Sequence, residues 1–299
     1  MATIKKERFK YINNAVVVSD LHAGCSFGLC PPEVQLDGGG TYQPKGAQRK
    51  IWEWWLEFWN EWVPDVIKGE PYCVIINGDA LEGRHHNSTT QISQNLADQQ
   101  KIAEMILRPI ATKAEGGFYM IRGTEAHVGG AGENEEPLAK LLGAIPEPGD
   151  KGNFARYELW LRLGGPNGSL CHILHHIGTT GSQAFEGTAL TKECTESLAE
   201  AARWGYPAPD FVIRSHRHRH YKCEFATRNK IGIGEITPGW QLKTPFTWKI
   251  PGGRVTTPQC GGILIRKGDR EHYTVHKVFN VTRTPEVIAI ETPTIRGSK

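Results

Sequence analysis

Four short clusters of polar residues carry side chains of the types that bind divalent metal ions in proteins. Each cluster directly follows a short apolar run of the kind that forms a buried β-strand. In chain order the clusters are Asp20-Leu21-His22, Asn77-Gly78-Asp79, His175-His176 and Ser215-His216-Arg217-His218. Carboxylate oxygens and imidazole nitrogens at the ends of neighbouring strands are the ligands that a catalytic metal pair needs. The four clusters together therefore predict a two-metal site.

The two carboxylate clusters differ in what their spacing allows. Asp20 and His22 are two residues apart, so at a strand end their side chains project from one face and can hold one metal ion. Asp79 follows a glycine that lets the backbone turn tightly, and its two oxygens can bridge two cations. Taken alone, each cluster also fits an ordinary polar loop or turn.

The histidine clusters leave alternatives open. His175 is the first polar residue after its strand and is the preferred ligand, with His176 in reserve. His216 and His218 can diverge, one towards each metal, once the chain has left its strand. The arginines around them also fit a basic loop that binds phosphate or nucleic acid, although nearby carboxylates favour the ligand interpretation.

The elements that must position these clusters alternate between strands and helices. Strands are expected at residues 15–19, 72–76, 118–121, 156–163, 170–174, 210–214, 261–265 and 273–278, and helices near 48–63, 93–107, 136–142 and the later part of 181–204. This order predicts an α/β fold in a single domain, residues 1–299. Its motif-bearing core is expected at about 12–220 and a β-rich completion at 221–299, which completes a second sheet. Residues 240–248 of that tail are an alternative lining for a substrate cleft.

The helix expected at residues 48–63 is unusually rich in tryptophan. Tryptophans recur at three- and four-residue steps and share one face: Trp52, Trp55, Trp59 and Trp62. Core packing is favoured for this stripe over a platform on which nucleic-acid bases stack. Trp54 falls off the stripe and is the better candidate for a surface contact, and Pro64 is expected to end the helix.

Composition limits the class of protein. Of the 299 residues, 39% are hydrophobic and 22% charged, and no apolar run approaches the roughly 20 residues that span a bilayer. The basic start lacks the apolar core of a signal peptide, so we expect a cytoplasmic protein with no membrane partner. A net charge of +3 does not require a nucleic-acid partner. Seven cysteines without C-x-x-C spacing suggest neither a disulfide framework nor a thiolate zinc site.

The order of the clusters resembles the calcineurin-like metallophosphoesterase family, which includes stand-alone phage and bacterial chains. The family pattern is D-x-H, G-D, G-N-H, a lone H and G-H-x-H. It is matched here by Asp20 and His22, by Gly78-Asp79, by His175, and by His216 and His218, with Ser215 replacing a glycine. The resemblance implies a four-layer αββα sandwich of two mixed β-sheets. It also implies two divalent ions bridged by a carboxylate and a hydroxide.

The third motif departs from the family pattern. Where Gly-Asn-His is expected, the chain reads Arg122-Gly123-Thr124-Glu125-Ala126-His127. In the preferred register Glu125 takes the place of the asparagine as a metal ligand, and His127 is the nearby proton donor. In the other register Thr124 takes that place and His127 does not contact the metals. A carboxylate here lowers the positive charge of the pair, which Arg84, Arg122 or Arg217 could offset.

The resemblance implies a hydrolase for phosphate esters, in which a metal-bridging hydroxide attacks phosphorus in line with the leaving group. The implied ligands are Asp20, His22, Asp79, Glu125, His175, His216 and His218. His127 is the implied catalytic residue, since it would protonate the leaving group or steady the charge on phosphorus. Mixed oxygen and nitrogen ligands suit two Mn²⁺ ions best, with Fe or Zn²⁺ as alternatives.

The sequence constrains the identity of the substrate less than it constrains the type of reaction. Arg84, His85 and Arg122 are candidates for holding it, and a solvated basic loop explains the run Arg84-His85-His86 equally well. A phosphodiester in a nucleic acid or nucleotide is favoured. The alternatives are a phosphomonoesterase, including a protein phosphatase, and a non-catalytic binding module of the same fold.

Overall fold

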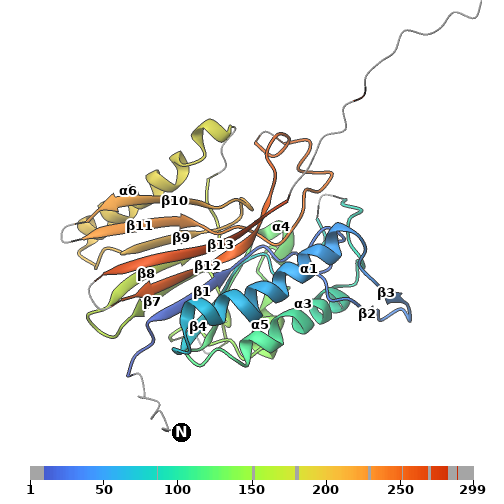
Figure 1. Cartoon of the computed structure of the whole chain (residues 1–299), viewed down its shortest axis with the longest axis horizontal. Coiled ribbons are helices and arrows are strands. Elements are labelled where there is room, and N and C mark those ends of the chain that lie inside the picture. The colour runs from blue at the N-terminus through green and yellow to red at the C-terminus, as the bar shows by residue number, and fades with distance from the viewer. Residues whose placement is uncertain are drawn as a thin grey trace, which may run out of the picture.

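Two β-sheets lie face to face between helices on both outer sides (Figure 1). This computed structural model describes residues 10–85, 87–149, 152–178, 182–227, 230–250, 252–268, 271–281 and 288. Helices α1, α2, α3 and α5 cover one outer face, and helix α6 covers the other. The expected four-layer αββα sandwich is therefore confirmed, and both of its sheets are mixed.

The six-stranded sheet has the order β13-β12-β1-β4-β5-β6. Its strands are β1 (Asn14–Val18), β4 (Tyr72–Asn77), β5 (Phe118–Ile121), β6 (Ala155–Arg156), β12 (Gln259–Lys267) and β13 (His272–Asn280). Strands β1, β4, β5 and β6 run parallel, whereas β12 is antiparallel to both β1 and β13. Parallel neighbours end at the same edge of a sheet, so the residues after β1 and β4 are brought together.

The five-stranded sheet has the order β10-β11-β9-β8-β7. Its strands are β7 (Glu158–Leu163), β8 (Ser169–Leu174), β9 (Phe211–Arg214), β10 (Tyr221–Ala226) and β11 (Ile231–Ile236). The expected completion of a second sheet is met by β10 and β11. Strands β12 and β13 instead pair with β1, so the β-rich tail enters both sheets. A small hairpin of β2 (Val34–Gln35) and β3 (Thr41–Tyr42) lies in the loop after β1.

The helices include one irregular turn at a position where the sequence prediction was wrong. They are α1 (Ala47–Glu57), the π-helix η1 (Phe58–Trp62), α2 (Val63–Ile67), α3 (Leu96–Ala111), α4 (Glu125–Val128), α5 (Glu135–Leu141), the 3₁₀ turn η2 (Gln183–Phe185) and α6 (Thr188–Trp204). Pro64 does not end the helix but lies in the first turn of α2, directly after η1. A first turn tolerates proline because its N–H groups have no partner within the helix. None of these helices, which are those of the described residues, combines the length and hydrophobicity that crossing a membrane requires.

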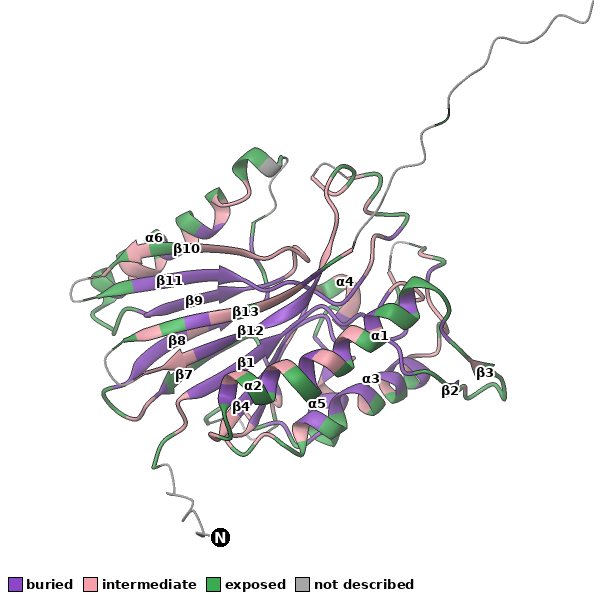
Figure 2. Ribbon diagram, in the orientation of Figure 1, coloured by how far each residue is buried: buried purple, intermediate pink, exposed green. Residues whose placement is uncertain are grey.

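Alternating side chains of β1 divide the core into layers. Val16 and Val18 pack under the helices, whereas Ala15 and Val17 pack between the two sheets. The sheets are accordingly buried along most of their central strands (Figure 2). A strand buried on both faces reads as a continuous apolar run, which is how the sequence of β1 predicted it.

The tryptophan stripe belongs to the core. Trp55 and Trp59 are buried in the layer between the helices and the six-stranded sheet, and Trp52 and Trp62 pack against the same layer. Trp54 stacks on the ring of Phe279, with 5.4 Å between ring centroids and 13° between planes. The preference for core packing is confirmed, and the stripe gives no support to a base-stacking platform.

Candidate metal centre

The ends of β1, β4, β8 and β9 bring the four polar clusters to one edge of the sandwich. Two groups of side chains there have ligand atoms that lie within 4.8 Å of one another. One group consists of Asp20, Asp79, His175 and His216, and the other of Asp20, His22 and His218. A third group of the same kind joins His22, Asp79 and His127. Because each aspartate belongs to two groups, the arrangement suits two neighbouring cations rather than one.

Several ligand atoms face each other at distances suited to a shared ion. Nε2 of His175 lies 3.1 Å from Oδ2 of Asp79, and Nε2 of His218 lies 3.2 Å from Oδ1 of Asp20. Nε2 of His22 lies 3.2 Å from Nε2 of His218. Two nitrogens bound at about 2.0–2.1 Å to one tetrahedral ion would be separated by roughly 3.3 Å. The spacing of the two imidazoles thus fits a metal between them.

Two buried atoms of the candidate ligands lack the hydrogen bonds that buried polar atoms normally make. They are Oδ1 of Asp20 and Nδ1 of His216, with which no residue of the described part of the chain makes a hydrogen bond. Leaving such groups unsatisfied costs about 1–3 kcal/mol each. A bound cation would satisfy both, so the donor set fits a metal site on its own chemistry.

Burial and charge act in opposite directions on the pKa values of these groups. Burial alone would raise the pKa of Asp20, but His218 and His175 hold it below its ordinary value. Asp79 is likewise held well below its ordinary pKa against burial, chiefly by His175. In turn, Asp79 and Asp20 outweigh burial and raise the pKa of His175 to about 10. Without metal, the protonated His175 is the counter-ion of both carboxylates, and metal binding would displace its proton.

The backbone at the site is strained. Seven non-glycine residues of the described chain have positive φ, and five of them are candidate ligands. Those five are Asp20, His22, Asp79, His216 and His218, with φ between 46° and 70°. A non-glycine residue in this region costs about 1–3 kcal/mol and persists where the surroundings enforce it, often at functional sites. Of the six residues in the first two ligand groups, all but His175 therefore have strained backbone.

Two glycines leave room for the ligand side chains. A Cβ atom on Gly78 would lie 2.3 Å from Nδ1 of His175, and one on Gly123 would lie 1.9 Å from Oδ1 of Asp79. Real Cβ contacts are never this short, so neither position accepts a larger residue without movement of a candidate ligand.

The third motif places Thr124, not Glu125, against the carboxylates. The backbone N–H of Thr124 donates to Oδ1 of Asp79 at 2.7 Å, and its hydroxyl lies 3.1 and 3.2 Å from the two Asp79 oxygens. Glu125 is exposed at the start of α4 and belongs to none of the described ligand groups. This geometry agrees with the register in which Thr124 stands at the asparagine position. The ligand role of Glu125 stays a prediction.

His127 nevertheless lies beside the ligands. Its ring centroid is 4.5 Å from that of His22 and 4.4 Å from that of His85. Nδ1 of His127 lies 2.6 Å from the carbonyl oxygen of Glu82, so Nδ1 carries the proton and Nε2 the lone pair in the neutral ring. Burial lowers the pKa of His127 to about 4, and His22 adds to this effect.

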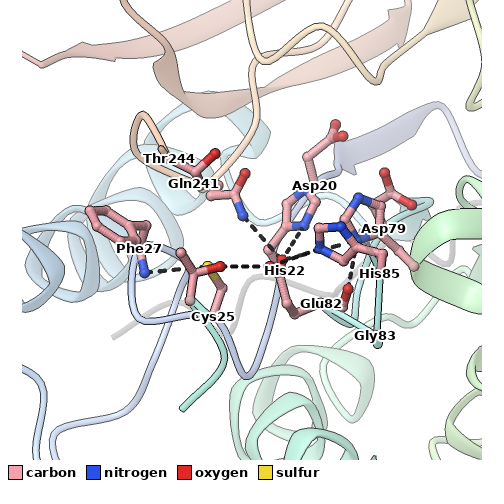
Figure 3. A network of polar contacts seen from close by, with 12 residues as sticks. Asp20, His22, Cys25, Phe27, Asp79, Glu82, Gly83, His85, Gln241 and Thr244 are labelled. Carbon is pink, nitrogen blue, oxygen red and sulfur yellow. Dashed lines mark hydrogen bonds and ion pairs between the residues drawn. The ribbon is translucent and has the colours of Figure 1, made fainter. Parts of the chain in front are cut away.

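Glu82 is a central residue of the site that sequence reasoning missed. Its carboxylate is buried and accepts hydrogen bonds from Nδ1 of His22 and Nε2 of His85, both at 3.0 Å (Figure 3). Gln241 and Thr90 donate to it as well, at 3.2 and 3.3 Å. Burial alone would raise the pKa of Glu82, but the bonds from both histidines hold it well below its ordinary value. A carboxylate behind a histidine fixes the tautomer that binds metal, here through Nε2 of His22.

Glu135 is a second buried carboxylate without a sequence signal. Its two oxygens accept hydrogen bonds from the backbone N–H groups of Ala80 at 2.6 Å and Gly123 at 3.0 Å. It thereby ties together the loops that follow β4 and β5. Burial, together with the charge of Asp79, raises its pKa to about 7.

A cavity of about 890 Å³ opens beside the ligand groups. It is lined by candidate ligands, by His85 and His127, by Arg217 and Arg219, and by residues 241–247. Residues 241–247 of the tail segment therefore line a cleft, whereas Trp240 is buried in the core and Trp248 is not part of the lining.

The structure separates the three candidates for substrate binding. His85 lines the cavity. Arg84 is exposed, and its Nε donates to the carbonyl of Gln94 at 2.5 Å. Arg122 donates to the carbonyls of Ala155 and Ala131 and does not line the cavity. His86 lies outside the described residues, and the reserve ligand His176 has its ring centroid 5.3 Å from that of His175.

No protein-family model and no characterised protein sequence matches the chain. Among solved structures, vacuolar protein sorting 29 from Cryptosporidium parvum has a TM-score of 0.38 and 11% identity, over 91% of this chain and 100% of that chain. The sulfate thiohydrolase SoxB from Thermus thermophilus, in complex with glycerol, has a TM-score of 0.36 and 12% identity. That match covers 90% of this chain and 57% of the SoxB chain. Similarity at this level assigns no activity, so function has to be argued from the site.

Proposed function

We propose that the chain is a two-metal phosphoesterase that hydrolyses phosphodiester bonds, with a nucleotide or nucleic acid as substrate. The observation that carries this proposal is the pair of ligand groups that share Asp20 and border one cavity. Two ions that share carboxylates are suited to in-line displacement at phosphorus, because they stabilise both the attacking and the leaving oxygen.

The ligands would divide between two ions. His22 and His218 would hold one ion, His175 and His216 the other, and the carboxylates of Asp20 and Asp79 lie between them. Thr124 orients Asp79 through two donors, as its hydrogen bonds indicate. A bound metal pair would supply an activated water at neutral pH and neutralise charge on the phosphoryl group. Asp/His ligation without cysteine makes Mn²⁺ the first ion to test.

His127 is proposed to respond to the substrate's charge. In the free site its low pKa keeps the ring neutral at pH 7. An anionic phosphoryl group in the cavity favours the protonated ring and so raises that pKa. His127 can then steady the negative charge or protonate the leaving oxygen, while the Glu82 carbonyl holds its Nδ1–H.

A nucleotide-like substrate is supported by two residues that line the cavity. This lining includes Lys249 and Phe246, which is 47% exposed. Cations suit phosphates, and an exposed aromatic ring suits stacking of a base. A volume of about 890 Å³ is also in the range of pockets for small organic ligands.

Hydrolysis of bis-p-nitrophenyl phosphate and p-nitrophenyl phosphate, with added Mn²⁺, tests the proposal. We expect the diester to be hydrolysed faster, and Asp79→Asn to lower the rate at least about 100-fold, since it removes a shared ligand. Asp65→Asn is the matched control, because Asp65 is exposed in the first turn of α2. A preference for the monoester, or full activity in Asp79→Asn, would contradict the proposal.

A further inference from the structure

A group of metal-binding side chains lies outside the proposed two-metal centre. It consists of His220, Glu235 and His276, whose ligand atoms all lie within 4.8 Å of one another. His220 directly precedes β10, Glu235 lies on β11, and His276 lies on β13. The group therefore joins the five-stranded sheet to the six-stranded sheet.

Strand register explains why these residues meet. Glu235 pairs with Ile213 of β9, and His276 pairs with Ile263 of β12. Paired residues on adjacent strands point to the same face of their sheet. Both isoleucines pack in the layer between the sheets, so Glu235 and His276 point into that layer from opposite sides.

The carboxylate of Glu235 is fully buried and only half satisfied. Its Oε1 accepts a hydrogen bond from Nε2 of His220 at 2.7 Å. Its Oε2 is buried and makes no hydrogen bond with any described residue. Burying a carboxylate is costly unless it is paired or bound to a metal, so the unpaired oxygen is suited to bind a cation.

The two imidazoles are placed to share that cation. The ring centroids of His220 and His276 are 4.1 Å apart, and the planes are inclined by 33°. The backbone N–H of His220 is held by Oε1 of Gln259 at 2.9 Å, which fixes the segment that carries the ring. Two imidazole nitrogens and one carboxylate oxygen form a ligand set that zinc adopts in proteins, with a fourth position left for water.

We propose that His220, Glu235 and His276 bind a single transition-metal ion, such as zinc, which cross-links the two sheets. This site is distinct from the two-metal centre. The three ligands meet only when both sheets have formed, so binding favours the folded state by mass action. The alternative is an ion pair between His220 and Glu235 in which His276 takes no part. The metal site and the ion pair differ in whether replacing His276 changes the metal content of the protein.

The test is zinc content per chain after equilibration with a zinc buffer and removal of free ion. We expect His276→Gln to hold one zinc ion per chain fewer than its parent. The loss should be the same in the wild-type chain and in Asp79→Asn, which keeps the result separate from the two-metal centre. His276 lies on the edge strand β13, where its side chain is exposed at the border of the layer between the sheets, so its replacement leaves the hydrophobic core unchanged. Zinc should also raise the unfolding temperature of Asp79→Asn more than that of the double variant Asp79→Asn/His276→Gln.

His272→Gln is the matched control. His272 lies on β13 but contacts the carbonyl of Ile231 and the hydroxyl of Ser169 instead of a carboxylate. This control should keep the zinc content of its parent. Equal zinc content in His276→Gln and its parent in both backgrounds would overturn the proposal. An equal loss in His272→Gln would also overturn it, since the loss would then come from β13 and not from the ligand.

Discussion

Replacing Glu82 by glutamine separates the role of its charge from that of its shape. Four donors converge on two buried oxygens, with His22 and Gln241 on Oε2 and His85 and Thr90 on Oε1. A glutamine has one acceptor oxygen, so whichever way it turns, one pair of donors faces an NH₂ group.

The size of the effect follows from what Glu82 does to His22. The carboxylate keeps the proton of His22 on Nδ1, which leaves Nε2 free to face Asp20 and His218. Outer carboxylates of this kind typically contribute 10–100-fold to metal affinity or activity, which is about 1.4–2.7 kcal/mol. Even if the amide oxygen faces His22, a neutral acceptor is weaker than a charged one. We therefore expect Glu82→Gln to weaken Mn²⁺ binding at least about tenfold.

The assay is activity of Glu82→Gln against free Mn²⁺ concentration, with direct Mn²⁺ binding measured in parallel. Glu158→Gln is the matched control, because Glu158 also accepts a hydrogen bond from a histidine, His172, at 2.9 Å. That pair lies on the five-stranded sheet, and Glu158 is exposed. We expect Glu158→Gln to bind Mn²⁺ as the wild type does.

A Glu82→Gln chain that binds Mn²⁺ as tightly as Glu158→Gln does would refute the reasoning. It would show that His22 either is no ligand or finds its tautomer without Glu82. If saturating Mn²⁺ restores the turnover of Glu82→Gln, the substitution acts only on metal binding. If turnover stays low at saturating Mn²⁺, the substitution also acts through His85 or His127.

Three further predictions concern the loop after β5. Thr124→Ala should lower diester hydrolysis by about tenfold or more, and Glu125→Ala should not; the reverse result would establish the register in which Glu125 is a ligand. Gly123→Ala should destroy Mn²⁺ binding through the clash with Asp79, whereas Gly130→Ala, with open space around it, should bind normally in the same titration. The third concerns chelator-treated protein, in which the folded pKa of His127 is about 4 and lies below the ordinary value of 6.5. The unfolded chain therefore takes up the proton first, so this share of stability, on the order of 3 kcal/mol, is present above pH 6.5 and lost between pH 6.5 and 4. Urea unfolding across that range should show a weaker pH dependence for His127→Gln, and an unchanged dependence would count against the burial argument.

The sandwich was predictable because its strands are buried on both faces. The runs that became β1, β4 and β9 are continuously apolar, and buried parallel strands have this pattern. Parallel pairing then brings the residues after β1 and β4 to one edge, so two clusters far apart in sequence meet. The short parallel contact between β8 and β9 does the same for the histidines.

The buried carboxylates of Glu82 and Glu135 could not be predicted, because no sequence pattern marks them. Glu82 lies in a polar loop and Glu135 at the start of a helix, where acidic residues are common and carry no special signal. Their role comes from donors far along the chain, such as Gln241 on Glu82 and Ala80 on Glu135. Such convergence depends on tertiary packing, which periodicity does not describe.

The spacing of Asp20 and His22 was expected to act through a strand, in which alternate side chains share a face. The structure brings both side chains into one ligand group with left-handed backbone at both positions instead. Leu21 between them is buried among the hydrophobic residues packed under the helices. His216 and His218 also have left-handed backbone, but they belong to different ligand groups, as expected. Asp and His tolerate this conformation better than β-branched residues do. The motif spacing therefore reflects two demands at once: ligand atoms that converge, and a backbone that can leave its strand within one residue.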